Sequence, residues 1–306
     1  MKDLHKDPTA VPEGGAPKDY QPPMADISWV KRKYLDIVYD TKSPVQKLDI
    51  YLPEEGEGPF PVLVHYHGGG FAFGDKRDDH MNAYLEGVRR GIAVASVEYR
   101  MSGEAIFPAA VLDARQSIRF LRLHGAEYHI DPDKIIALGG SSGGNLAASL
   151  AMNVPNGGFP GENPVAILPA EPVVALGIDQ FGPIDFLSME TQAVEAGLWE
   201  EGHDDSHSPE SRYLGVAVSK APERLVQAAN PVTYATPAMA PLLIQHGTAD
   251  HLIPYAQSVN FAKELEAKGL GDKVQLVLLD GADHEDKMFF EKENMDVVFD
   301  FIRNNI

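Results

Sequence analysis

One stretch of sequence, Leu138-Gly139-Gly140-Ser141-Ser142-Gly143-Gly144-Asn145-Leu146-Ala147, decides how the chain folds. It follows a short apolar run and leads into a sequence compatible with a helix. A strand, then G-x-S-x-G, then a helix is the nucleophile-elbow pattern, in which a tight turn holds a serine above a sheet. Glycine flanks this turn because a side chain there would collide with the neighbouring strand or helix. The N-terminus of the following helix favours an anion formed during attack by the serine.

The motif fits in two registers, with either Ser141 or Ser142 at its centre, and the spacing does not choose between them. The main alternative is a phosphate-binding glycine loop. However, the stretch lacks the lysine of a P-loop, and the chain contains no G-x-G-x-x-G. The motif therefore favours a serine nucleophile.

The rest of the chain predicts the sheet that such an elbow requires. Residues 34–39 and 46–53 alternate with period two, which predicts an antiparallel hairpin. Continuous apolar runs predict strands that are buried on both faces, as in a parallel sheet, over 61–66, 92–97, 134–138, 174–178, 242–245 and 274–279. Helical spacing predicts helices over 109–123, 257–268 and 287–302. The predicted fold class is α/β, a mostly parallel central sheet with helices on both faces.

Residues 183–230 interrupt this alternation and are too long for an ordinary connection. Short helical patterns at about 186–198 and 222–228 predict a small cap insertion over a site. Residues 1–26 are rich in proline, glycine and charge, which predicts a flexible N-terminal arm. Because there is no internal repeat or long linker, residues 27–306 are predicted to form one catalytic domain that carries the cap.

A second glycine-rich loop, His67-Gly68-Gly69-Gly70-Phe71, follows the third predicted strand. Enzymes with a nucleophile elbow place further donors to an oxyanion at this point. Successive glycines let backbone N–H groups turn toward one point, and loss of one such donor typically costs about 10²–10³ in rate. The loop alone is compatible with a flexible turn, but upstream of an elbow the two motifs support each other.

An activated serine needs a base, and the base needs an orienting carboxylate. Asp250 lies in a turn after one predicted strand, and His284 lies in a turn after the last one. This gives the chain order Ser, Asp, His that the elbow enzymes use. We therefore predict Asp250 as the acid and His284 as the base.

Other residues compete for these roles. His246 and His251 flank Asp250 but break the chain order, so they are interpreted as structural or rim residues. Asp280 and Asp283 lie in the same short turn as His284, from which they reach its Nδ1 only awkwardly.

The segment His203-Asp204-Asp205-Ser206-His207 has the i, i+4 histidine spacing of a zinc-binding helix. Gly202 precedes it, Ser208-Pro209 follow it, and aspartate stands where such metalloproteases use glutamate. A polar loop is the favoured interpretation, and we expect neither a metal nor a cofactor.

Composition narrows the set of partners. The chain has 306 residues, and 26 basic against 45 acidic side chains give a formal charge of −19, which repels phosphate backbones and anionic lipids. The absence of cysteine excludes disulfides, thiol nucleophiles and cysteine-bound metals. We therefore expect a small-molecule substrate and neither nucleic acid nor membrane as partner, with homo-oligomerisation left open. An acidic first segment and the lack of apolar runs of about 18 residues lead us to expect a cytoplasmic protein.

In combination these motifs resemble the serine esterases of the α/β-hydrolase fold. The resemblance is strongest to the branch with carboxylesterases and acetyl-xylan and feruloyl esterase-like proteins, near the hormone-sensitive-lipase group, and it covers about residues 45–302. The matching stretches are Lys47–Pro53, His67–Phe71, Gly74–Lys76, Tyr99-Arg100, Phe107–Ala110, Ile130–Ile135, Gly139–Ala147, Asn230–Val232, His246–Asp250 and Ile253-Pro254.

The family pattern reads G-x-S-x-G-G followed by a polar residue, so the resemblance implies through Asn145 that Ser141 is the nucleophile. Two positions depart from the pattern. Gly140 stands where the lipase-like relatives usually carry an acidic residue, and Ser142 replaces the common alanine.

The resemblance implies hydrolysis of small neutral acetyl, short-chain acyl or cinnamoyl-type esters through an acyl-enzyme. His284 would take the proton of Ser141, and Asp250 would orient His284. The implied oxyanion hole consists of the backbone N–H groups of Gly69, Gly70 and Ser142.

Two other functions stay open at this point. An amidase, formamidase or exopeptidase could use the same residues, because the triad does not choose the leaving group. A catalytically inactive binding protein of the same fold is a further alternative, although such a protein need not keep all three residues.

The predicted cap carries a run of carboxylates without intervening lysine or arginine, which we interpret as a solvated acidic face. If the cap covers the site, it would repel anionic substrates. The residues are Glu190, Glu195, Glu200, Glu201, Asp204, Asp205 and Glu210.

Overall fold

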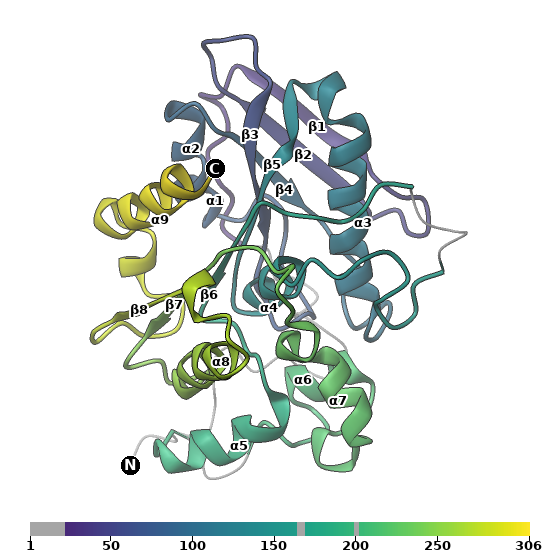
Figure 1. The fold of residues 1–306 in the computed structure, drawn as a ribbon, viewed down its shortest axis with the longest axis vertical. Helices are drawn as coiled ribbons and strands as arrows, with labels where there is room; N and C mark the ends of the chain where they lie inside the picture. The colour runs from purple at the N-terminus through teal and green to yellow at the C-terminus, as the bar shows by residue number, and fades with distance from the viewer. Residues whose placement is uncertain (1–21, 164–168, 199–201) are drawn as a thin grey trace.

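The computed structural model describes residues 22–163, 169–198 and 202–306. Within these ranges, eight strands form one sheet in the order β1-β2-β4-β3-β5-β6-β7-β8 (Figure 1). The strands are β1 Arg32–Val38, β2 Lys47–Leu52, β3 Phe60–Tyr66, β4 Ala93–Val97, β5 Ile130–Gly140, β6 Leu176–Gln180, β7 Leu242–Gly247 and β8 Val274–Leu279. The pairs β1–β2 and β2–β4 are antiparallel, and all later pairs are parallel. The predicted hairpin and parallel sheet are therefore confirmed.

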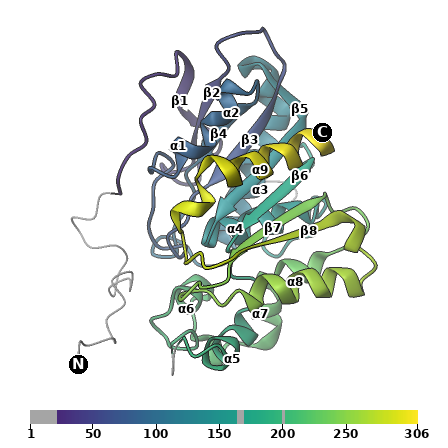
Figure 2. The same ribbon diagram turned by 90° about the vertical axis from the view of Figure 1, so that its left-hand side faces the viewer.

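Helices cover both faces of this sheet. They are α1 Met81–Tyr84, α2 Glu86–Arg89, α3 Ala109–His124, α4 Ser142–Ala151, α5 Phe186–Glu195, α6 Pro209–Leu214, α7 Glu223–Ala229, α8 Ala256–Ala267 and α9 Lys292–Asn305. Figure 2 shows α9 in front of the sheet and α3 behind it. The predicted helices 109–123 and 257–268 match α3 and α8 to within a residue. The predicted helix 287–302 begins late, because a 3₁₀ turn at Lys287–Phe289 precedes α9.

Alternation along the central strands divides the core in two. In β5, Ile135 and Ala137 face the side that α3 and α4 cover, whereas Ile136 and Leu138 face the side of α1, α2 and α9. All four side chains are fully buried. Because neither face of the sheet meets solvent at this point, the strand is a continuous apolar run instead of an alternating one.

The segment 183–230 contains α5, α6 and α7, which gather at one end of the sheet in both views (Figures 1 and 2). The short helices predicted at about 186–198 and 222–228 correspond to α5 and α7, while α6 had no clear sequence signal. We call this segment the cap. Its assignment as an insertion within one domain stays a prediction.

Stacking and hydrogen bonds fasten the cap to the rest of the molecule, for example at Tyr213 and at Gln257. The ring of Tyr213 in α6 stacks on Phe71 with the ring centres 3.8 Å apart, and its carbonyl accepts a 2.6 Å hydrogen bond from the N–H of Phe107. The side chain of Gln257 in α8 accepts hydrogen bonds from the N–H groups of Ile184 and Asp185 at 2.9 and 2.7 Å. Both contacts place the cap over the carboxyl ends of the strands.

The predicted acidic face of the cap is only partly solvated. Asp205 and Glu195 are exposed, but Glu210 is buried, which contradicts the expectation for that residue. Glu190 is half-buried, and its carboxylate accepts hydrogen bonds from the N–H groups of Gly202 and the two residues that follow it. Glu190 therefore ties α5 to the loop that begins at Gly202. Glu200 and Glu201 lie outside the described residues.

Most of the predicted N-terminal arm, residues 1–21, lies outside the described residues. The end of the arm is attached to the domain. Met24 forms an isolated β-bridge with Asp78, and the N–H of Ala25 donates a 2.9 Å hydrogen bond to the carbonyl of Arg77. None of the helices in the described ranges is long and apolar enough to cross a membrane.

A buried ion pair network fastens α3 to the loop that follows α4. Arg115 and Arg119 project from α3 and both contact Glu162, with 2.7 Å between Nε of Arg115 and Oε1 of Glu162. All three side chains are about 1% exposed. Two buried guanidinium groups therefore depend on one carboxylate.

We predict that Glu162→Gln lowers the free energy of unfolding by about 3–5 kcal/mol, because two buried cations lose their counter-charge. Urea unfolding monitored by circular dichroism measures this change. The control is Glu54→Gln, which removes the exposed ion pair between Glu54 and Lys31 and should change stability little. Equal effects of the two substitutions would contradict the prediction.

Candidate active site

Ser141 lies in the turn between β5 and α4, with φ 53° and ψ −125°. A residue other than glycine in this backbone region is strained and persists only where its surroundings enforce it. Close packing explains the neighbouring glycines, because a Cβ on Gly143 would lie 2.0 Å from the carbonyl oxygen of Tyr66. The turn thus has the geometry of a nucleophile elbow, as the sequence predicts.

The three predicted catalytic side chains lie in one line. Oγ of Ser141 is 3.1 Å from Nε2 of His284, and Nδ1 of His284 is 2.7 Å from Oδ2 of Asp250. The turns that carry Asp250 and His284 follow β7 and β8, which are paired up to Gly247 and Leu279. The pairing of these two parallel strands therefore brings the two turns together at one edge of the sheet.

Asp250 is buried and fully hydrogen-bonded. Its Oδ1 accepts from the N–H groups of Leu252 and Ile253 at 2.9 and 2.7 Å, and its Oδ2 also lies 3.1 Å from Nε2 of His246. His246 is fully buried, with Nδ1 2.7 Å from Oγ of Ser258. This burial agrees with the interpretation of His246 as a structural residue, but its contact with Asp250 was not predicted from the sequence. The i, i+4 spacing of the two residues was the available signal.

The competing acids do not reach the imidazole of His284. Asp283 accepts a 2.7 Å hydrogen bond from the backbone N–H of His284 and pairs with the exposed His251. Asp280 accepts a hydrogen bond from the hydroxyl of Thr248 at 3.2 Å. Among these carboxylates, Asp250 is therefore the one that contacts Nδ1 of His284.

The carboxylate of Asp250 and the imidazolium of His284 stabilise each other. Burial disfavours the ionised form of Asp250, but the adjacent His284 and His246 outweigh it and hold the pKa of Asp250 well below its usual range. Burial likewise disfavours the imidazolium of His284, but Asp250 outweighs it and raises the pKa of His284. The site is therefore built to stabilise a protonated His284 beside an ionised carboxylate.

The second glycine loop starts beside the elbow, because Tyr66 at the end of β3 is paired with Gly139 in β5. Gly69 has φ 104°, and a Cβ there would lie 2.1 Å from the carbonyl oxygen of Phe73, so only glycine fits. Within the described residues, no acceptor takes the N–H of Gly69 or Gly70. Ser142 is the first residue of α4, so its N–H has no acceptor within the helix. The N–H groups of the predicted oxyanion donors are therefore available, and the loop passes close to the nucleophile, because a Cβ on Gly68 would lie 3.4 Å from Cβ of Ser141.

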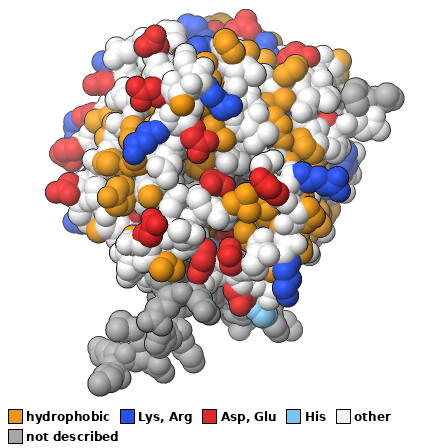
Figure 3. All heavy atoms as spheres, turned by 60° about the horizontal axis from the view of Figure 1, so that its bottom comes forward, with side chains coloured by type: hydrophobic (Ala, Val, Ile, Leu, Met, Phe, Trp, Pro, Cys, Tyr) orange, Lys and Arg blue, Asp and Glu red, His pale blue; other side chains and the backbone are white. Residues whose placement is uncertain are grey.

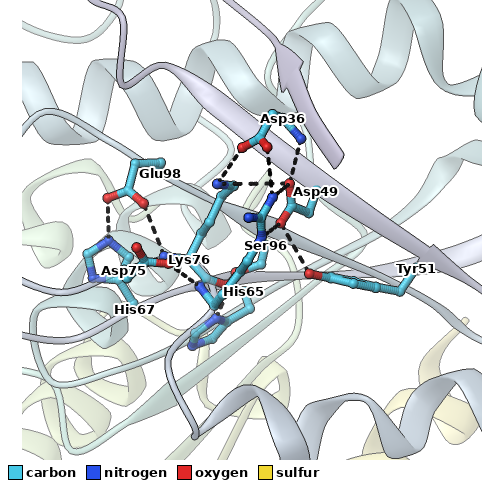
Figure 4. Close-up of polar contacts among 10 residues, drawn as sticks. Asp36, Asp49, Tyr51, His65, His67, Asp75, Lys76, Ser96 and Glu98 are labelled. Carbon is cyan, nitrogen blue, oxygen red and sulfur yellow. Dashed lines mark hydrogen bonds and ion pairs between the residues drawn. The ribbon is translucent and has the colours of Figure 1, made fainter. Parts of the chain in front are cut away.

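A buried histidine holds this loop in place (Figure 4). Nδ1 of His67 is 2.8 Å from the carbonyl oxygen of Gly68, and Nε2 is 3.3 Å from Oε1 of Glu98. The other oxygen of Glu98 accepts a 3.1 Å hydrogen bond from the N–H of Lys76. Tyr99 stacks on the ring of His67 at 4.5 Å and donates a 2.8 Å hydrogen bond to its carbonyl. The loop is thus clamped at its first residue.

The charges of His67 and Glu98 depend on each other. Burial disfavours the imidazolium, but Glu98 outweighs it and raises the pKa of His67. Burial also disfavours the carboxylate, but His67 outweighs it and lowers the pKa of Glu98. Neither role was predicted from the sequence, because the two residues are separated in the chain and meet only through the pairing of β3 with β4.

Two cations extend the clamp to the edge of the sheet (Figure 4). Nζ of Lys76 is 2.9 Å from Asp36, and Nε of Arg77 is 2.5 Å from Asp49, whose side chain is fully buried. The hydrogen bond from Lys76 lowers the pKa of Asp36 to about 2. The segment that follows the glycine loop is therefore tied to β1 and β2.

The His203–His207 segment forms turns and no zinc-binding helix. Nδ1 of His203 lies 3.6 Å from Oε2 of Glu210, and Nδ1 of His207 lies 2.9 Å from Oδ1 of Asp205. Across the described ranges, no group of three histidine or acidic side chains is arranged to hold a metal ion. The two histidines take part in contacts within the cap.

Residues 48–265 match the model of the BD-FAE family. The chain belongs to the BD-FAE family. Its members are carboxylic ester hydrolases of the α/β-hydrolase fold, so the predicted resemblance and fold class are confirmed. This BD-FAE chain is similar to the probable isoprenylcysteine alpha-carbonyl methylesterase ICMEL1 of Arabidopsis thaliana, with 29% identity over 82% of the chain and 50% of the relative. It is similar to esterase LipQ of Mycobacterium tuberculosis, with 28% identity over 76% and 53%.

The chain spans about half the length of these curated relatives. Among solved structures, it is similar to a truncated form of carbohydrate esterase from gut microbiota, with a TM-score of 0.77, 26% identity, and coverage of 92% of the chain and 99% of that structure. It is also similar to a bifunctional GH43-CE of Bacteroides eggerthii, with a TM-score of 0.78, 28% identity, and coverage of 90% and 35%. The site lies on a fold that esterases share.

We predict that Glu98→Gln lowers kcat for p-nitrophenyl acetate by about tenfold with little change in KM. The substitution weakens the hold on the oxyanion loop, so the loss should be smaller than the 10²–10³ typical for a missing donor. Steady-state kinetics measure the change, and Glu86→Gln on the surface of α2 is the matched control. An unchanged kcat would show that the contact between Glu98 and His67 does not support the loop.

Proposed function

We propose that this protein is a serine carboxylic ester hydrolase that acts through an acyl-enzyme on small neutral esters with acetyl, short-chain acyl or cinnamoyl-type acyl groups. The observation that carries the proposal is the unbroken line of contacts from Ser141 through His284 to Asp250. A strained serine, a buried imidazole and an ionised carboxylate in this order form the constellation of nucleophilic acyl transfer.

The first half-reaction transfers the acyl group to the protein. Nε2 of His284 accepts the proton of Ser141 as Oγ attacks the carbonyl carbon of the ester. The resulting oxyanion accepts hydrogen bonds from the N–H groups of Gly69, Gly70 and Ser142. When the tetrahedral intermediate collapses, His284 gives its proton to the departing alcohol, and the acyl group stays on Ser141.

The second half-reaction repeats these steps with water. His284 takes a proton from water as the water oxygen attacks the acyl-enzyme, and the same N–H groups hold the second oxyanion. Collapse releases the carboxylic acid and returns the proton to Oγ of Ser141. Asp250 keeps His284 in the tautomer that presents Nε2 to the serine in both halves.

Two observations support neutral substrates, including acyl esters of carbohydrates. The end of the molecule that carries the cap shows acidic and apolar side chains close together (Figure 3), and Asp205 and Glu195 are exposed there. A negative field of this kind disfavours anionic esters. In addition, two solved structures that share more than 25% identity with the chain are described as a carbohydrate esterase and a bifunctional GH43-CE.

We expect Ser141→Ala to lower kcat on the order of 10⁴-fold or more, because it removes the nucleophile. Ser142→Ala should cost far less, because the proposed contribution of Ser142 is its backbone N–H. The assays use p-nitrophenyl acetate, butyrate and octanoate together with acetylated xylan and methyl ferulate. Equal losses in the two variants would show that the proposed register is wrong.

The same assays test the proposal against its alternatives. p-Nitroacetanilide is included because the relay itself does not distinguish an ester from an amide. A clear preference for this amide would favour an amidase. A folded wild type that is inert toward every ester would overturn the proposed function.

A further inference from the structure

Glu285 directly follows His284 and has φ 55°, in the left-handed region that favours glycine. A glutamate in this region is strained, whereas glycine would adopt the same backbone freely. Ser141 is another strained residue at this site, and its strain serves to present the nucleophile. Residues with a strained backbone cluster at functional sites, which indicates a function for the side chain of Glu285.

The carboxylate of Glu285 points at the reaction centre. Its Oε1 lies 3.0 Å from the position that a Cβ on Gly68 would occupy, and Cβ of Ser141 lies 3.4 Å from that same position. The glutamate therefore lies against the first glycine of the oxyanion loop, on the side of the nucleophile. Its charge is also one of those that raise the pKa of His284, after the larger effects of burial and Asp250.

This carboxylate does not hold the fold together. The residue is exposed, and in the described part of the chain no hydrogen bond or ion pair reaches its oxygens. Another carboxyl group near it belongs to Asp78, which is buried and whose pKa is raised by burial, with a further contribution from Glu285. His80 lies on the far side of Asp78, with Nδ1 4.0 Å from Oδ1. A free carboxylate next to the reacting serine is therefore open to the substrate.

We propose that Glu285 determines substrate specificity by accepting hydrogen bonds from hydroxyl groups next to the scissile ester, as in an acylated sugar, and by repelling anionic esters. The inference rests on the proposed ester hydrolysis and names the substrate class for that site. An ionised carboxylate only accepts hydrogen bonds, and its two oxygens can bind two neighbouring hydroxyls at once. Such charge-assisted bonds are stronger than neutral ones.

The test compares two esters of acetic acid in wild type, Glu285→Gly and Glu285→Gln. One is a mono-acetylated methyl xyloside, which has free hydroxyls, and the other is p-nitrophenyl acetate, which has none. We expect the ratio of kcat/KM for the xyloside to that for p-nitrophenyl acetate to fall about 10- to 100-fold in Glu285→Gly. In Glu285→Gln the fall should be smaller, because the amide oxygen still accepts a hydrogen bond.

Two further readouts separate recognition from a structural role. The melting temperature of Glu285→Gly should be equal to or higher than that of wild type, because glycine relieves the strain. Glu285→Gln should improve kcat/KM for the anionic ester mono-p-nitrophenyl succinate relative to p-nitrophenyl acetate. The control is Glu293→Gln, an exposed acid at the start of α9, which should leave both ratios unchanged.

The pH profile supplies an independent check. The carboxylates near His284 are Asp250, Asp283 and Glu285, and each favours its imidazolium. Because the proposed base must be neutral, removal of the charge of Glu285 should shift the acidic limb of kcat/KM for p-nitrophenyl acetate to lower pH.

Several results would overturn the proposal. One is a ratio of kcat/KM for the xyloside to that for p-nitrophenyl acetate that is unchanged in Glu285→Gly. Another is a clear fall in the melting temperature of Glu285→Gly. A third is a selective loss of activity toward acetylcholine in this variant, which would indicate a cation site instead. Failure of the proposed function looks different, because the wild type itself would then be inert toward both acetates.

Discussion

The hydrogen bond between Nδ1 of His284 and Oδ2 of Asp250 is the interaction on which the rest of the site depends. It fixes the tautomer and the direction of the imidazole, and so decides whether Nε2 faces Ser141. The sheet makes the bond possible, because β5, β7 and β8 run parallel and end at one edge. Three turns that are far apart in the chain therefore converge on one point, and each needs only local features to present its residue.

Two buried polar clusters keep this point rigid. One fixes Asp250 through His246 and two backbone N–H groups, and the other fixes the oxyanion loop through His67 and Glu98. Both clusters use a buried histidine in contact with a carboxylate, and in the second each charge outweighs the effect of burial on the pKa of the other group. The strained backbone of Ser141 is also held by its surroundings, because the neighbouring glycines pack closely against adjacent strands.

Much of this arrangement could be predicted from the sequence, for physical reasons. The central strands are buried on both faces, so their sequences are continuous apolar runs. Glycines are needed where backbones approach closely at the elbow and in the oxyanion loop, so both motifs can be recognised in the sequence. Chain order then selected Asp250 and His284 as partners. The structure brings these residues together as the sequence implied.

Other features escaped prediction because they arise from contacts distant in the chain. The position of β2 beside β4, the contact of His67 with Glu98 and the burial of Glu210 all depend on tertiary packing. The short helices α1, α2 and α6 are too brief to give a helical pattern. The orientation of Glu285 depends on its backbone conformation, and no sequence pattern predicts a glutamate with positive φ.

Covalent labelling of the nucleophile is the most direct test of the assignment of Ser141. A fluorophosphonate reacts with an activated serine, and intact-mass analysis followed by tandem mass spectrometry counts the labels and locates them. If the assignment is right, we expect one label per chain, on Ser141, which forms much more slowly in His284→Ala. A label on Ser142, or an active wild type that carries no label at the elbow, would contradict it.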